Sequence, residues 1–82
     1  MAFAYFSLMS ADQMAKFLLV DPRIHGGEPV FRGTRVPVQS LFDHLESGDS
    51  IEQFLDGFRT VKREQVIGLL EILRAETLAV AS

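Results

Sequence analysis

The stretch that decides the fold is Asp21–Val38, which reads DPRIHGGEPVFRGTRVPV. Its opening Asp-Pro pair ends whatever element comes before, because proline lacks an amide donor and disfavours a helical residue ahead of it. Further along, Val30–Phe31 and Arg35–Val36 flank a tight turn at Gly33–Thr34, a pattern typical of a two-stranded β-hairpin. We therefore predict a β-hairpin segment over residues 21–37.

Three amphipathic segments follow the hairpin. The first begins after Pro37, places apolar residues at i, i+3, i+4 and i+7, and stops at Gly48. The second opens with a capping box made by Ser50 and Gln53. The third is the longest and spans about 61–79. We predict a mainly α fold: a small β-hairpin segment followed by a three-helix, helix-turn-helix-like bundle over residues 38–80, similar to a homeodomain or a winged helix.

Residues 1–20 precede this unit as an N-terminal arm. Ser10 and Gln13 fit another capping box, which predicts a short helix near 11–17. The arm also carries several apolar side chains within residues 3–9, and these need an apolar partner. Two interpretations stay open: they pack on their own domain, or they pack on a second subunit.

Size and composition limit the class of protein. The 82 residues allow a single domain, 1–82, with one core, and 48% apolar against 23% charged residues exclude a disordered chain. There is no cysteine, hence no disulfide and no thiolate metal site, which favours a reducing compartment. The start lacks the basic lead and cleavage site of a signal peptide, and Asp12 interrupts it well short of a membrane span. We expect a cytoplasmic protein without a membrane partner.

The third helix carries more apolar residues than one face can hold. Seven of them cover much of its circumference, and only a strip through Glu64, Gly68, Glu71 and Ala75 looks solvated. A homodimer through this helix would bury the excess, and packing by the N-terminal segment is the alternative. The residues predicted to form a dimer or partner interface are Ile67, Leu70, Leu73, Phe3 and Phe6.

Neither catalytic nor metal-binding equipment is visible. His25 and His44 are the only histidines, and no ligand spacing accompanies them. His25 is interpreted as a turn residue, and His44 as lying on the polar side of its helix. The acidic residues of the stretch 43–56 are spread over two helices and a turn, which favours a solvated face over a calcium site. We expect no enzyme activity, cofactor, metal or small-molecule substrate.

The cations at the start of the third helix indicate an anion-binding site. Lys62 and Arg63 stand at the start of the third helix, where the helix dipole disfavours positive charge, and Arg59 is close by. An external anion there would meet free backbone N–H groups, as DNA does in helix-turn-helix proteins. The alternative is two solvated cations offset by Glu64 and the acidic second helix. The predicted DNA-contacting residues are Arg59, Lys62, Arg63, Gln65, Arg32 and Arg23, although the net charge of −3 argues the other way.

The segment Asp21–Val38 resembles the signature D-P-x-I-x-x-G-x-P-V-x-x-G-T-R-x-x-V of the bacterial family called domain of unknown function 433. The residues that carry the resemblance are Asp21, Pro22, Gly27, Pro29, Gly33, Thr34, Arg35 and Pro37. The resemblance implies a small β segment followed by a three-helix unit. It also implies a VapB-like antitoxin that binds a PIN-like nuclease toxin and its own promoter DNA.

Two features depart from the family pattern. Lys62 stands where the family usually has Ser or Thr as a helix cap, and residues 1–17 have no clear counterpart. Most of the signature is interpreted as scaffold, with Arg35 either bridging to Asp21 or capping backbone carbonyls of the first helix.

Two functions from different classes therefore compete. The first is a dimeric antitoxin-like regulator that neutralises a toxin and binds DNA as an autorepressor. The second is a protein–protein interaction module without DNA binding, whose acidic helices mimic nucleic acid or shield a basic site on the partner. The net negative charge favours the second.

Overall fold

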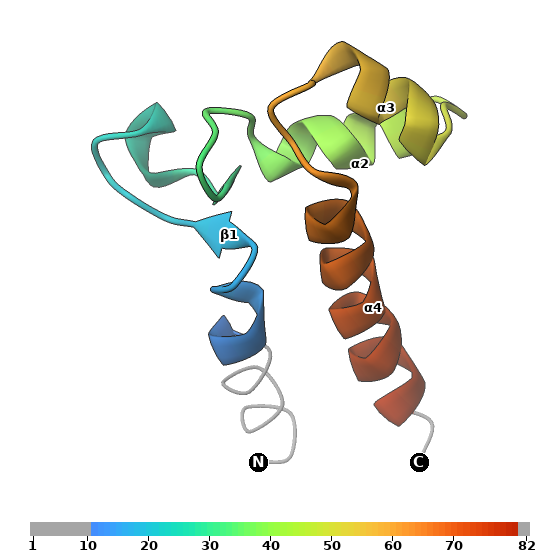
Figure 1. Cartoon of the computed structure of the whole chain (residues 1–82). Coiled ribbons are helices and arrows are strands. Elements are labelled where there is room, and N and C mark those ends of the chain that lie inside the picture. Colours follow the sequence, from blue (N-terminus) through green and yellow to red (C-terminus); the bar gives the residue numbers. More distant parts are fainter. Residues whose placement is uncertain (1–10, 81–82) are drawn as a thin grey trace.

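The structure is a computed structural model that describes residues 11–80. After helical residues 11–14, the elements in chain order are β1 (Leu18–Leu19), the 3-10 turn η1 (His25–Gly27), β2 (Val30–Phe31), α2 (Val38–Glu46), α3 (Ile51–Gly57) and α4 (Arg63–Ala79). Figure 1 shows α2 and α3 together at one end, with α4 running away from them. The predicted fold class is confirmed: the chain is mainly helical, and a small antiparallel β element precedes the three helices.

The β element differs from the prediction in its partner strand. β2 pairs with β1, in the register Leu18 opposite Phe31 and Leu19 opposite Val30. The turn at Gly33–Thr34 forms as predicted, with φ of 81° at the glycine. The return segment 35–36 is nevertheless no strand, and beyond the turn only one bridge forms, between Val30 and Pro37. The ladder stops there because the Val36 amide donates to the Thr34 hydroxyl at 3.0 Å instead of to a neighbouring strand.

The three helices follow the predicted pattern closely. α2 ends before Gly48, whose φ of 88° is the left-handed conformation that glycine adopts most easily. The capping box of α3 is present in full, since Gln53 N–H donates to Ser50 Oγ at 3.1 Å and Ser50 N–H donates to Gln53 Oε1 at 2.7 Å. α4 begins two residues later than predicted, at Arg63, because Val61 turns into the core and is 4% exposed.

One small core holds these elements together. Its members come from β2, from all three helices and from the α3–α4 loop, and they are Val30, Phe31, Val38, Leu41, Phe54, Val61, Val66 and Leu69. The rings of Phe31 and Phe54 lie 6.1 Å apart at its centre, so the β segment and α3 share one apolar contact. Full burial of such a side chain contributes about 1.5–3 kcal/mol.

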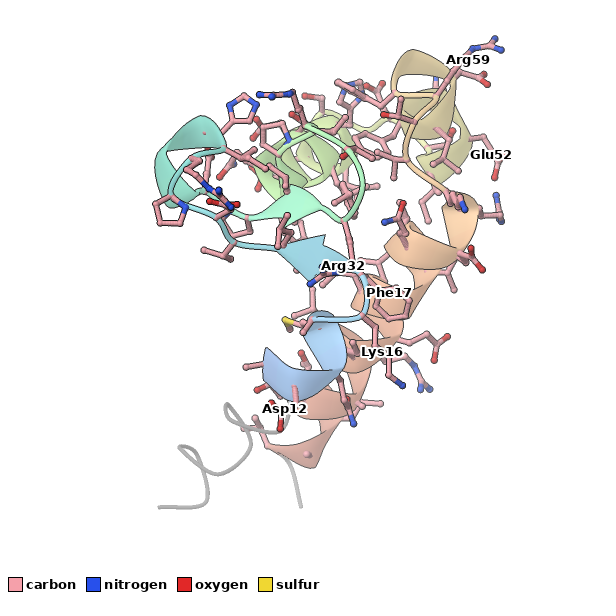
Figure 2. The ribbon with its side chains drawn as sticks, turned by 60° about the vertical axis from the view of Figure 1, so that its left-hand side comes forward. Asp12, Lys16, Phe17, Arg32, Glu52 and Arg59 are labelled. Atoms are coloured by element: carbon pink, nitrogen blue, oxygen red, sulfur yellow. The ribbon has the colours of Figure 1, made fainter. Side chains whose placement is uncertain are left out.

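The N-terminal segment packs against its own domain at α4. A Cβ added at Gly68 would lie 2.4 Å from Cζ of Phe17, so the phenyl ring rests directly on the helix backbone (Figure 2). The prediction that Gly68 belongs to a solvated strip was therefore wrong, because Phe17 covers it. Met14 and Leu18 also pack against the core. Phe3, Phe6 and Ser10 lie outside the described residues, so their predicted roles stay predictions.

Candidate functional site

Three of the cations predicted to contact DNA lie in or directly after the loop between α3 and α4. Arg59 is exposed and points away from the body in Figure 2. Lys62 is the N-cap of α4 and is exposed as well. Arg63, the first residue of α4, forms an ion pair with Glu52 of α3, and both side chains are more than half exposed. The acidic second helix thus offsets one of the two cations at the start of α4, as the alternative interpretation of this turn expected.

Gln65 was wrongly predicted to contact DNA. It is 8% exposed, and its amide is used inside the protein. Its Oε1 accepts from Lys62 N–H at 2.9 Å, and its Nε2 donates to the carbonyl of Arg32 at 2.9 Å and to that of Phe17 at a longer 3.4 Å. A side chain with these partners ties α4 to the β segment and is not available to a base or a phosphate.

The two arginines of the β segment that were predicted to contact DNA, Arg23 and Arg32, are also engaged within the chain. Arg32 Nε donates to the carbonyl of Ala15 at 3.0 Å, and its Nη2 donates to that of Leu18 at 3.2 Å. Its guanidinium therefore fixes the N-terminal segment. In Figure 2 it faces that segment, well away from Arg59. Of the predicted DNA-contacting residues, the structure gathers only those next to the start of α4.

Arg23 pairs with Asp21. Its Nη2 lies 2.9 Å from Asp21 Oδ2, and its backbone N–H donates to Oδ1 at the same distance. Hydrogen bonds from this guanidinium and this amide hold the pKa of the Asp21 carboxyl below its usual value, and the carboxylate raises the pKa of Arg23. The predicted alternative of an Arg35 bridge to Asp21 is wrong, because the neighbouring Arg23 occupies that carboxylate.

His44 lies in a different environment from the one predicted. Its ring meets Phe54 and Phe58 edge-on, with centroids 5.5 and 5.7 Å away, so it packs between α2 and α3 and not on a polar face. Its Nδ1 is 2.9 Å from Asp49 Oδ2. Within residues 11–80, no three potential metal-ligating side chains cluster. Nor does any helix of that range have the length and apolar character that crossing a membrane requires.

A shallow, mostly apolar groove lies between the turn segment Gly33–Pro37 and the α3–α4 loop that carries Arg59. It is lined by Leu19, Ile24, Gly33, Thr34, Arg35, Val36, Pro37, Phe58 and Thr60. The signature turn therefore has two roles: one side of it meets the core, and the other forms a wall of the groove. Sequence reasoning missed this surface, because its parts come from three segments and no periodicity connects them.

These signature residues correspond to a known family. The family model described as "Protein of unknown function (DUF433)" matches residues 19–71, well over half of the chain. The chain belongs to the DUF433 family. The matched DUF433 region covers the groove lining, α2, α3 and the first half of α4.

One curated relative matches part of the chain. It is the uncharacterized protein y4eO of Sinorhizobium fredii (strain NBRC 101917 / NGR234), 40% identical over 45 residues. The match covers 55% of this chain and 20% of the relative, so the matched stretch is a minor part of that longer protein. No solved structure matches the chain.

The predicted interface residues on α4 fall into two groups. Leu70 and Leu73 are half-buried and pack against the protein's own core. Ile67 is half-buried but lies outside that core cluster. Beyond the matched DUF433 region, Leu78 and Val80 are 56% and 72% exposed. The apolar excess of α4 is thus covered in part by the N-terminal segment, and its distal end stays open within the described chain.

Proposed function

We propose that this chain is a protein-interaction module of the antitoxin type, which binds and neutralises a partner protein through apolar surface without contacting nucleic acid. The partner class that the family resemblance implies is a PIN-like nuclease toxin. This proposal takes the neutralisation of a toxin from the first of the two functions that the sequence left open, and the absence of DNA binding from the second.

One observation supports it above all: most of the predicted DNA-contacting side chains have partners inside the chain. Gln65 and Arg32 bind backbone carbonyls, while Arg23 and Arg63 pair with carboxylates. DNA binding depends on releasing counterions from several phosphates, and each phosphate needs a cation that is available to it. Among the described members of the predicted set, Arg59 and Lys62 alone lack such a partner.

A homodimer through the distal part of α4 belongs to the same proposal. The two exposed apolar residues at that end, Leu78 and Val80, would gain a partner in a second copy. Sedimentation equilibrium tests this point. A Leu78→Glu, Val80→Glu variant is expected to be monomeric where the unchanged chain is a dimer, and a monomeric unchanged chain would contradict the dimer.

Co-expression with the product of the adjacent reading frame tests the proposed function. We expect a complex that survives gel filtration in about 0.5 M salt, where the Debye length is only a few ångström and purely electrostatic contacts fail. Loss of nuclease activity in that complex would support neutralisation. A partner that stays separate and fully active would refute the proposal.

A DNA-binding autorepressor is the second candidate. Arg59 and Lys62 support it, together with the exposure of the Arg63–Glu52 pair, which a phosphate could displace. Gel-shift titration against the upstream DNA at low salt tests it. An unaltered affinity in an Arg59→Ala, Lys62→Ala double variant would refute this contact, and no binding at any salt concentration would refute the DNA role.

A further inference from the structure

The groove beside the signature turn brings together three distant parts of the chain. One wall is the turn segment Gly33–Pro37, the opposite wall is Phe58 and Thr60 of the α3–α4 loop, and Leu19 and Ile24 contribute from the N-terminal side. Each wall is fixed from behind. Phe31 N–H donates to Val36 O at 3.0 Å, and Phe58 stacks on the buried Phe54 with ring centroids 4.9 Å apart.

Residues 11–80 leave the apolar side chains of the groove partly uncovered. Leu19, Ile24, Val36, Pro37 and Phe58 are all half-buried, in contrast to the almost fully buried core behind them. Covering such surface stabilises a complex by about 25 cal/mol for each Å² removed from water. An apolar side chain of a partner protein is therefore the natural occupant of the groove.

The groove also has a charge preference. Arg35 lines it and is exposed, and within the described part of the chain no carboxylate pairs with it. Arg23 and Arg63, by contrast, each have a carboxylate partner. Arg59 stands between the two lining residues of the α3–α4 loop. A carboxylate that reached Arg35 would form a charge-assisted pair with bidentate geometry at the edge of the apolar surface.

We propose that this groove docks an extended segment of a partner protein, in which an apolar side chain lies next to a carboxylate. The apolar residue packs against Phe58 and Ile24, and the carboxylate binds Arg35. An extended segment fits better than a helix, because short turns and not two long helices line the groove. Nucleic acid fits poorly, because its closely spaced phosphates require a row of cations where the lining holds one. The proposal rests on the proposed function, since it names the surface through which the partner is bound.

The test uses the full chain labelled with ¹⁵N and two fluorescent octapeptides, one alternating leucine with aspartate and one alternating leucine with lysine. We expect the aspartate peptide to bind, and to shift the amide signals of Leu19, Ile24, Arg35, Val36, Phe58 and Thr60. An Arg35→Gln variant is expected to bind it about tenfold more weakly, which corresponds to about 1.4 kcal/mol. Arg23→Gln is the matched control, because that arginine is also exposed but already paired with Asp21; the affinity of this variant is expected to stay unchanged.

Several results would overturn the proposal. They are the absence of any peptide binding in the millimolar range, equal affinity for the two peptides, signal changes confined to α4, and equal effects of the two arginine variants. Shifts of the groove signals by a DNA duplex but not by the aspartate peptide would also overturn it. The partner experiment is independent: a complex with the adjacent gene product that tolerates Arg35→Gln would refute the groove and leave the protein-binding function intact. Peptide binding without such a complex would support the groove and refute the toxin partner.

Discussion

Replacing Gln65 by alanine removes the side chain that joins α4 to the β segment. The variant loses two well-formed hydrogen bonds, to Lys62 N–H and to the carbonyl of Arg32, both at 2.9 Å. Each contributes about 0.5–1.5 kcal/mol, and the partly buried carbonyl of Arg32, left without this donor, adds to the loss. We therefore expect Gln65→Ala to lower the free energy of unfolding by about 2 kcal/mol. For a domain of this size that is a large part of the total, and the melting temperature should fall by about 8–16 °C.

Urea unfolding followed by circular dichroism measures this loss. The matched control is Gln39→Ala on α2, where an exposed glutamine donates to Asp43 at 2.9 Å; its change should stay within about 0.5 kcal/mol. A Gln65→Glu variant extends the test, because a carboxylate would face carbonyl oxygens at this buried position. One carboxylate oxygen would still accept from Lys62 N–H, but the other would repel the carbonyl of Arg32, so Gln65→Glu should also be less stable than the unchanged protein at pH 7. A Gln65→Ala variant as stable as the unchanged protein would refute the structural role of this residue.

Three further predictions follow from the contacts described. Gly68→Ala should destabilise the protein by about 1 kcal/mol, because the new methyl group displaces the Phe17 ring. In a Phe17→Ala background the same change should stabilise the protein by about 1 kcal/mol, because alanine has the higher helix propensity. Additive effects in a double-mutant cycle measured by urea unfolding would contradict this contact. Ser50→Ala should lower the free energy of unfolding by about 1 kcal/mol through loss of the α3 cap, and a change below about 0.3 kcal/mol would count against it. The ion pair with Arg23 lowers the pKa of the Asp21 carboxyl, so the pair contributes to stability at neutral pH and this contribution disappears as the pH falls through the lowered pKa. Asp21→Asn should therefore be less stable than the unchanged chain at pH 7 and equally stable in strong acid. A difference in melting temperature that does not depend on pH would contradict the pair.

Local patterns in the sequence predict the helices well. The spacing of apolar residues and the capping box at Ser50 give α2 and α3 to within a residue or two, since these signals depend only on neighbours along the chain. Gly33 and Gly48 likewise mark turns that form with positive φ, because a local backbone conformation requires them.

The errors come from contacts between distant residues. Gln65 looks like an exposed polar residue at the start of a helix, yet its partners Arg32 and Phe17 are 33 and 48 positions away. Gly68 looks solvated on a helical wheel, but Phe17 covers it from the other end of the chain. The pairing of β1 with β2 has the same cause, because no turn sequence joins Leu18–Leu19 to its partner strand.

The candidate site was harder to predict than the fold. The exposure of Arg59 and Lys62 agrees with the sequence, which predicts both as cations available to an external partner. The groove was not foreseen, because turn residues such as Arg35 and Val36 carry no periodic signal that distinguishes a wall of a groove from scaffold. Only the fold determines which cations pair with a carboxylate, as Arg23 and Arg63 do.

Partner binding without nucleic acid is tested most directly by one calorimetric comparison on the full chain. The purified protein is titrated with the product of the adjacent reading frame in about 0.5 M salt, and with its own upstream DNA duplex in about 0.05 M salt, where phosphate contacts are strongest. We predict that the product of the adjacent reading frame binds saturably and that the duplex gives no heat of binding. Tight, salt-sensitive binding of the duplex, together with no binding of the adjacent gene product, would contradict the proposed function.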